Sequence, residues 1–291
     1  MPELQPNDGR PSIWFETKGE RSNDPLLLLH GFTGTHRTWD DLVERLAEKH
    51  FLMLLDLPGH GRSGTSPSRA KMGLGPTSDT VADLVRLNMG DGGGRKPVIL
   101  GYSLGGRVAL DLACGHQELL SGLILEGASP GIERDEEREE RRAKDDALAD
   151  EIERRGLEWF VDYWQDTPLF ATQKDLPPRD FEGIRRDRLS NSARGLAMSL
   201  RGAGTGEMVP LWDKLENLRI PVLFVVGERD RRYAQTGEAM RRRIPRSVVA
   251  EVEAAGHCVH VERPEEFADL VERFLEDRSA AMPAARSEPQ A

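Results

Sequence analysis

The segment PVILGYSLGGRVALDLA, residues 97–113, decides the fold. It opens with an apolar run of strand length and closes with the apolar spacing of a helix. Between the two, Gly101-Tyr102-Ser103-Leu104-Gly105 has the G-x-S-x-G spacing of a nucleophile elbow, in which a serine sits on a sharp strand-to-helix turn. The pentapeptide alone is a weak signal, but the strand before it and the helix after it are the context that it requires. We therefore predict that Ser103 is a nucleophile, against the alternative of an ordinary glycine turn.

Apolar runs of strand length recur on both sides of this segment. They are Leu26–Leu29, Phe51–Asp56, Leu120–Glu126, Ile220–Gly227 and Val248–Val252. Such continuous runs are typical of parallel strands that are buried on both faces. Helical apolar spacing separates them, as in Thr38–Lys49 and Asp79–Asn88. The alternation predicts an α/β fold with a mostly parallel sheet and helices on both faces.

The composition changes in the middle of the chain. In Glu133–Asp146 every residue but one is charged, which is typical of a solvated helix with ion pairs four residues apart. Helical patterns continue through Leu148–Phe160 to about residue 210, with no convincing strand. We predict that residues 133–210 are a helical cap inserted into a core formed by residues 11–132 and 211–277.

Composition and charge exclude several classes of protein. The net charge of −10 over 291 residues argues against a nucleic-acid partner, which needs a basic face. The longest apolar runs are far shorter than the roughly 20 residues of a transmembrane helix, and the N-terminus lacks the pattern of a secretory signal, so we expect a cytoplasmic protein without a membrane span. No spacing predicts a metal site or a phosphate-binding loop. The composition of residues 278–291 predicts a disordered tail.

A serine hydroxyl needs a neighbouring base to act as a nucleophile at neutral pH. With a nucleophile elbow, the order along the chain is serine, acid, histidine. His257 follows a late predicted strand and precedes the last predicted helix, Pro264–Glu276, and Asp230 lies just past the strand PVLFVVG. We predict that Ser103, Asp230 and His257 form a catalytic triad, in which the acid holds the imidazole tautomer.

Three other acids and one thiol are alternatives for the same roles. Glu228 and Asp56 are nearby candidates for the acid, although a structural role in the following glycine turn suits Asp56 better, and Glu126 is the choice if the site uses the preceding strand. Cys258 directly follows the histidine, but no thiol-protease pattern surrounds it. The other cysteine, Cys114, does not make a disulfide framework in a chain of this size.

The remaining histidines are predicted to be structural, and one of them marks a useful loop. His30 and His60 occur in glycine turns, and His260 is expected to pack or to line the pocket. The loop that begins at His30 can aim the Phe32 N–H at the same point as the N–H of Leu104, which starts a helix. We predict that these two amides form an oxyanion hole.

The chain from about Pro25 to Leu275 resembles the α/β-hydrolase superfamily. The motifs that carry the resemblance are HGF at 30–32, DLPGHGRS at 56–63, GYSLGG at 101–106, VVGERD at 225–230 and AGH at 255–257. A narrower resemblance is to the 2-succinyl-6-hydroxy-2,4-cyclohexadiene-1-carboxylate synthases of menaquinone biosynthesis. It rests on GYSLGGRVAL at 101–110, EGASPGI at 126–132, the charged run 136–146, WFVDYW at 159–164 with PLF at 168–170, SLRGAGTG at 199–206 and LW at 211–212.

This resemblance implies a lyase without a cofactor. Its substrate would be a small carboxylate anion, 2-succinyl-5-enolpyruvyl-6-hydroxy-3-cyclohexene-1-carboxylate, from which the triad, acting as a general base, eliminates pyruvate. The resemblance places Arg141 and Arg188 near the carboxylate-binding arginines of the family, with Arg142 or Arg186 as alternatives, and it implies no oligomeric state. Two aromatic side chains are expected to line the pocket, and these are Tyr102 and Trp164.

Arg107 supports the narrower resemblance. It lies one turn into the helix after Ser103, where an apolar side chain is expected. A buried unpaired arginine costs on the order of several kcal/mol, so this side chain needs a partner. The partner is either a protein acid or a carboxylate of the substrate, held bidentately.

Two other functions remain open. The triad would equally serve a serine carboxylesterase or a carbon–carbon bond hydrolase, since one fold supports many chemistries. A non-catalytic binding module is disfavoured because all triad residues stand in the required order. A dehalogenase or an epoxide hydrolase would place an aspartate at the position of Ser103.

Overall fold

The computed structural model describes residues 3–89 and 94–277, so the tail 278–291, where the sequence predicts disorder, lies outside the described residues. The described residues form one eight-stranded sheet with the order β1-β2-β4-β3-β5-β6-β7-β8. The strands are β1 Glu3–Leu4, β2 Ile13–Lys18, β3 Asp24–Leu29, β4 His50–Leu55, β5 Val98–Tyr102, β6 Gly122–Glu126, β7 Val222–Gly227 and β8 Ser247–Val252. The β1–β2 and β2–β4 pairs are antiparallel and the others parallel, which confirms the predicted fold class.

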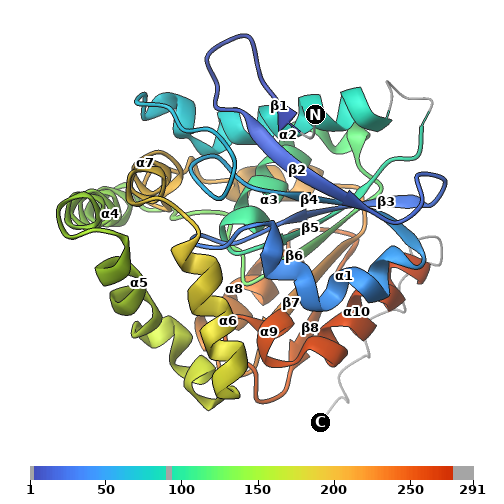
Figure 1. The fold of residues 1–291 in the computed structure, drawn as a ribbon. Coiled ribbons are helices and arrows are strands. Elements are labelled where there is room, and N and C mark those ends of the chain that lie inside the picture. The colour runs from blue at the N-terminus through green and yellow to red at the C-terminus, as the bar shows by residue number, and fades with distance from the viewer. Residues whose placement is uncertain (1–2, 90–93, 278–291) are drawn as a thin grey trace.

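Helices cover both faces of the sheet (Figure 1). Helices α2 Leu74–Met89, α3 Leu104–His116 and α8 Arg231–Arg241 pack on one face, and α1 Asp40–Ala47, α9 Val259–Glu262 and α10 Pro264–Asp277 pack on the other. Alternate residues of β3 point to opposite faces: Leu27 and Leu29 join the first core, while Leu26 and Leu28 join the second. Because both faces are buried, the central strands have to be apolar throughout.

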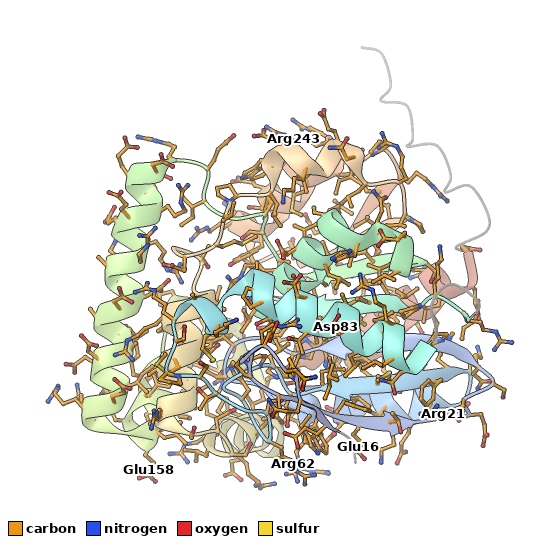
Figure 2. All side chains as sticks on the ribbon, turned by 90° about the horizontal axis from the view of Figure 1, so that it is seen from above. Glu16, Arg21, Arg62, Asp83, Glu158 and Arg243 are labelled. Atoms are coloured by element: carbon orange, nitrogen blue, oxygen red, sulfur yellow. The ribbon has the colours of Figure 1, made fainter. Side chains whose placement is uncertain are left out.

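Four α-helices lie between β6 and β7 and form one side of the molecule (Figure 1). They are α4 Asp135–Arg155, α5 Leu157–Gln165, α6 Pro178–Leu189 and α7 Ala193–Ala203. A separate apolar cluster that includes Ile152, Phe160 and Leu196 holds them together. Figure 2 shows α4 along one flank, with many of its charged side chains extended into solvent. No strand occurs in residues 133–210, all of which the structure describes.

The structure differs from the sequence predictions at three places. The helical pattern Leu148–Phe160 is interrupted at Gly156, where a φ of 88° ends α4 and starts α5. Helix α2 begins at Leu74, earlier than predicted. The strands β1 and β2 were missed because they lie at the antiparallel edge, where β2 carries polar and apolar residues and is only partly buried.

The carboxyl ends of the central strands lie side by side. Leu29 of β3 is paired with Gly101 of β5, Tyr102 of β5 with Glu126 of β6, and Glu126 with Val225 of β7. The loops after these strands therefore meet at one edge of the sheet, which is where open α/β sheets place their ligands. Among the described helices, none is long and apolar enough to cross a membrane.

Candidate active site

The turn at Ser103 has the geometry of a nucleophile elbow. Ser103 lies between β5 and α3 with φ 49° and ψ −104°, a strained backbone for a residue with a side chain. Its N–H donates to the Glu126 carbonyl at 2.8 Å. Close approach makes two glycines necessary: a Cβ on Gly101 would lie 2.5 Å from the Gly105 carbonyl oxygen, and one on Gly105 would lie 2.1 Å from that of Leu29. The strain is thus held by tight packing on both sides of the serine.

The structure brings the three predicted triad residues together. His257 Nε2 lies 3.1 Å from Ser103 Oγ, and His257 Nδ1 lies 2.6 Å from Asp230 Oδ2. His257 is buried in the segment between β8 and α9, whereas Asp230 follows β7 and begins α8. Both distances are within the reach that proton transfer requires.

The alternative acids have other partners. The Glu126 carboxylate accepts hydrogen bonds from the N–H and from Nδ1 of His260. Asp56 accepts from the N–H of His36 at 2.7 Å and from a second loop amide, as its predicted structural role requires. Glu228 accepts from the N–H of Ala254 at 2.8 Å. None of these three carboxylates is bonded to His257.

His30 and His60 hold loops together below the site. His30 Nδ1 donates to the Gly31 carbonyl at 2.7 Å, and its Nε2 accepts from the N–H of Leu57 at 2.9 Å. His60 Nδ1 donates to the Pro58 carbonyl, and burial lowers the pKa of His60 to about 3. Both imidazoles are therefore neutral, and neither contacts the triad by a hydrogen bond.

Of the two predicted oxyanion donors, Leu104 directly follows the nucleophile and Phe32 follows Gly31, which packs against the elbow. Leu104 is the first residue of α3, so its N–H has no acceptor within the helix. The loop after β3 touches the elbow, because a Cβ on Gly31 would lie 3.4 Å from the Ser103 Cβ. Within the described part of the chain, no acceptor is bonded to the N–H of Phe32 or of Leu104.

Two arginines near the site have no carboxylate partner among the described residues. Arg107 Nη1 donates to the Ala203 carbonyl at 2.7 Å, and burial lowers the pKa of its guanidinium to about 10. Arg188 is only 5% exposed; its Nη2 donates to Gln173 Oε1 at 3.2 Å, and its Nη1 has no described partner. Its guanidinium lies 4.7 Å from the centre of the Phe170 ring. Neither guanidinium therefore has an ion pair, although Asp145 and Asp187 act on Arg107 and Arg188 from a greater distance.

The other cap arginines are placed differently. Arg141 Nε is paired with Asp145 Oδ1 at 2.8 Å, and Arg142 is paired with Glu207. Arg186 is exposed on α6. The positive charge on Arg141 repels that on Arg107 and contributes to the lowered pKa of Arg107, so the two guanidinium groups lie within electrostatic reach of one another. Arg142 and Arg186 were the alternatives to Arg141 and Arg188. The first is ion-paired with an acid, and the second is exposed to solvent.

Aromatic rings connect the cap to the triad. The Trp164 ring lies 5.4 Å from that of Phe32 and 5.8 Å from that of Phe170, and the Phe170 ring lies 6.3 Å from that of His257. Trp164 Nε1 is buried without a described partner. The cap helix α5 thus reaches the predicted oxyanion loop through Trp164.

Tyr102 and Cys258 lie together under the elbow. The Tyr102 hydroxyl is 2.6 Å from Cys258 Sγ, and both residues belong to the core that α9 and α10 cover. Burial raises the pKa of the Cys258 thiol well above its usual range. A protonated, buried thiol is a poor nucleophile, which argues against a thiol mechanism.

Two residues at the site escaped the sequence analysis. The Tyr233 ring lies 4.6 Å from the His257 ring, and a Cβ on Gly127 would lie 2.7 Å from His257 Cε1. Gly127 has φ 54°, a backbone that favours glycine. Its place directly after a strand was a signal that could have been used, whereas nothing in the sequence marks Tyr233.

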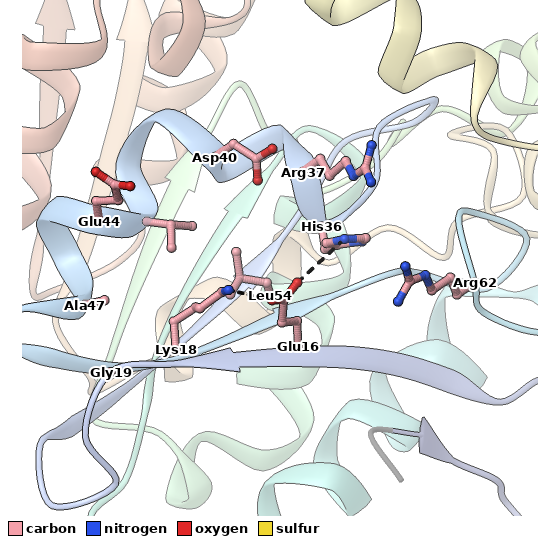
Figure 3. A pocket seen from close by; sticks show the side chains of 11 residues that line it. Glu16, Lys18, Gly19, His36, Arg37, Asp40, Glu44, Ala47, Leu54 and Arg62 are labelled. Atoms are coloured by element: carbon pink, nitrogen blue, oxygen red, sulfur yellow. Dashed lines mark ion pairs between the residues drawn. The ribbon is translucent and has the colours of Figure 1, made fainter.

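A hollow elsewhere on the surface is not part of this site. It lies beside β2 and α1, and its walls include Glu16, Lys18 and His36 (Figure 3). These groups pair with one another: Lys18 Nζ is 2.7 Å from Glu16 Oε1, and His36 Nε2 is 3.8 Å from Glu16 Oε2. None of the predicted site residues lines the hollow.

Comparisons with known proteins identify the family of this chain. A family model described as "Alpha/beta hydrolase family" matches residues 26–270. A putative 2-succinyl-6-hydroxy-2,4-cyclohexadiene-1-carboxylate synthase from Bacillus subtilis (strain 168) is 38% identical over 262 residues, covering 89% of this chain and 92% of the relative. The synthase from Yersinia pseudotuberculosis serotype O:3 (strain YPIII) is 32% identical over 263 residues, covering 90% and 91%.

Solved structures point to the same group. MenH from S. aureus superimposes with a TM-score of 0.86 at 34% identity, covering 92% of this chain and 98% of that chain. A thermophilic esterase from Thermogutta terrifontis superimposes with a TM-score of 0.80 at 27% identity, covering 94% and 98%.

Proposed function

The chain belongs to the alpha/beta hydrolase family and, within it, to the 2-succinyl-6-hydroxy-2,4-cyclohexadiene-1-carboxylate synthases, and on this premise we propose that it is a lyase of menaquinone biosynthesis. It eliminates pyruvate from 2-succinyl-5-enolpyruvyl-6-hydroxy-3-cyclohexene-1-carboxylate. The observation that carries this proposal, beyond the relatives, is a Ser–His–Asp arrangement near a half-buried arginine, Arg107, and a buried one, Arg188, neither of which is paired with a protein carboxylate.

The triad acts as a general base in this reaction. The substrate proton at C2 is acidic because it lies next to the ketone of the succinyl group. Ser103 Oγ gives its own proton to His257 Nε2, to which it is hydrogen-bonded, and takes the C2 proton in its place. Asp230 accepts from Nδ1 and stabilises the imidazolium. A base of this kind contributes about 10²- to 10⁴-fold to the rate.

The electron pair from the C2–H bond completes the elimination. It first forms an enolate on the succinyl ketone, and the N–H groups of Phe32 and Leu104 donate to this oxygen. Each donor of this kind contributes about 3 kcal/mol of transition-state stabilisation. When the enolate collapses, the ring double bond shifts and the C5–O bond breaks. The leaving group departs as the enolate of pyruvate, and the proton held by the His257 imidazolium returns to it. The product carries the 2,4-diene that its name describes.

The arginines bind the carboxylates of the substrate. Arg107 and Arg188 have neutral partners only, so a carboxylate would supply the missing counter-charge. Arg141 contributes a third positive charge, which Asp145 partly offsets. Tyr102 and Trp164 complete the pocket, with residues 133–210 as its cap over a core of residues 11–132 and 211–277.

We also place the enzyme in the cytoplasm, because a substrate with several charges does not cross a bilayer unaided.

Release of pyruvate from the purified protein tests this proposal. The wild type should release one pyruvate per substrate consumed, Ser103→Ala should release almost none, and Arg107→Ala should lose far more activity on this anion than on a neutral ester. If Arg107→Ala loses the same factor on both substrates, the arginine has a structural role.

Ester hydrolysis is the second candidate. The similarity to an esterase structure favours it, and the triad itself does not choose between elimination and acyl transfer. Turnover of short esters without any pyruvate release would establish the hydrolase and refute the lyase.

A further inference from the structure

The loop that carries Phe32 has a strained backbone next to the nucleophile. Thr33 is β-branched and buried, yet its φ is 75°. Residues of this kind rarely adopt a left-handed backbone, so the surroundings must hold it in place. The Phe32 amide directly precedes this residue, and Gly31 touches Tyr102 and Ser103. Whatever fixes Thr33 therefore also fixes the Phe32 N–H.

Asn191, in the connection between α6 and α7, holds this backbone. Its Nδ2 donates to the Thr33 carbonyl at 2.8 Å and to the Arg188 carbonyl at 3.1 Å. Its Oδ1 accepts from the Gly61 N–H at 2.9 Å. The amide is buried and joins the loop after β3, the loop after β4 and the end of α6. A surface polar residue would not be arranged in this way.

Asp187 makes a second connection from the same helix end. Its carboxylate accepts from the N–H of Thr35 at 3.1 Å and also from the Thr35 hydroxyl. Thr35 is 2% exposed and closes the loop that begins at Gly31. Asn191 and Asp187 thus grip the loop on both sides of its strained residue, while Arg188 between them faces Phe170 and Gln173.

We propose that Asn191 and Asp187 are positioning residues that hold the Phe32 amide next to Ser103. Through them, the position of the cap helices determines the geometry of the oxyanion hole. The inference rests on the proposed function only in taking the Phe32 N–H as a donor to a developing negative charge. A misplacement of about 1 Å at such a donor costs about 100-fold in rate. Neither residue touches the reacting atoms, so both act through the backbone of the loop.

Covalent labelling of Ser103 by phenylmethanesulfonyl fluoride tests this inference without the natural substrate. The reagent is neutral, so it does not use the arginines, but its sulfonyl oxygen needs the same two amides. Asn191→Ala should lower the labelling rate about 10- to 100-fold, measured by intact mass against time. Asn191→Asp keeps the size of the side chain and the hydrogen bond from the Gly61 N–H, but it loses both hydrogen bonds that Nδ2 donates. Its labelling rate should therefore fall by a similar factor, and this variant serves as the test if Asn191→Ala does not fold.

The control is Ser192→Ala, one residue away. The Ser192 side chain is the N-cap of α7 and accepts a hydrogen bond from the Gly195 N–H. Its removal therefore destabilises the start of α7 and leaves the hydrogen bonds to the loop after β3 intact. Its labelling rate should stay within about twofold of wild type, with thermal unfolding showing that each variant is folded. Wild-type labelling in a folded Asn191→Asp, or an equal loss in Ser192→Ala, would overturn the inference. Rapid labelling of a wild type that releases no pyruvate would instead refute the proposed function alone.

Discussion

Replacing Arg188 by methionine should make the protein more stable and less active. The Arg188 guanidinium is buried, with one neutral oxygen and one aromatic ring as its described partners. Burial lowers the pKa of this guanidinium below its usual value, which means that the surrounding groups do not offset the free energy lost when the charge leaves water. Methionine has a similar length and carries no charge to desolvate.

The balance of free energies gives the expected size of the change. The effective cost of burying an ion is on the order of several kcal/mol. The bond to Gln173 returns about 1.5–3 kcal/mol and the contact with Phe170 about 0.5–2 kcal/mol. Since replacing buried charges by apolar groups often stabilises by about 1–4 kcal/mol, we expect a gain of about 1–3 kcal/mol for Arg188→Met. Each kcal/mol would raise Tm by about 2–4 °C.

The loss of activity follows from the carboxylate that this arginine would bind. Removing one partner of a buried charge pair costs about 3–5 kcal/mol. Because each 1.36 kcal/mol is a factor of ten, kcat/KM for pyruvate release should fall by at least about 100-fold. Labelling of Ser103 by a neutral sulfonyl fluoride should change little, because that reaction does not need the arginine.

Calorimetry and steady-state kinetics on two variants decide the matter. The matched control is Arg186→Met on the same helix, where the arginine is exposed and a substitution should change stability by about 0.5 kcal/mol or less. A lower Tm for Arg188→Met, together with equal losses in pyruvate release and in labelling, would refute the reasoning and make Arg188 a structural residue.

Three further predictions concern the triad, a thiol and pH. Asp230→Asn should lower kcat for pyruvate release by up to about 10⁴-fold, because the asparagine favours the wrong imidazole tautomer; a loss below tenfold would exclude Asp230 as the acid. Cys258→Ser should keep its activity within about threefold, since burial keeps the thiol protonated; a loss as large as that of Ser103→Ala would identify the thiol as the nucleophile. The free energy of unfolding should fall as the pH drops from about 6.5 toward about 3. In this range His60 is protonated in the unfolded chain but stays neutral in the folded protein, where burial lowers its pKa to about 3. Urea titrations at several pH values should show a flatter dependence for His60→Asn, and an unchanged slope would contradict this origin.

The centre of the fold was readable from the sequence for a physical reason. Strands such as Leu26–Leu29 are buried on both faces, so every residue must be apolar and the run stands out. Ser103 could be found because the elbow requires glycines at fixed spacing, and His257 and Asp230 because each follows a strand of the same sheet. These signals are local, and one stretch of chain carries each of them.

The rest depends on contacts between distant parts of the chain. Nothing near Asn191 in the sequence reveals that its amide holds Thr33, 158 positions away. In the same way, the sequence did not reveal whether a protein acid pairs with Arg107, and the structure shows the Ala203 carbonyl as its hydrogen-bond acceptor. Strand β2 escaped notice because most of its side chains are only partly buried or exposed, so polar residues interrupt the apolar run.

The distribution of charge distinguishes this site from that of an esterase with the same triad. The chain has ten more acidic than basic charges, so acids to neutralise Arg107 and Arg188 are plentiful. Many exposed arginines do have such a partner, as Arg154 has Glu151, yet the half-buried Arg107 and the buried Arg188 donate to neutral acceptors only. An uncompensated buried cation lowers the stability of the folded protein, and hydrolysis of a neutral ester would gain nothing from it. On the proposed function, an anion with several carboxylates would recover that free energy on binding, so the arginines, more than the triad, favour a polyanionic substrate over a neutral ester.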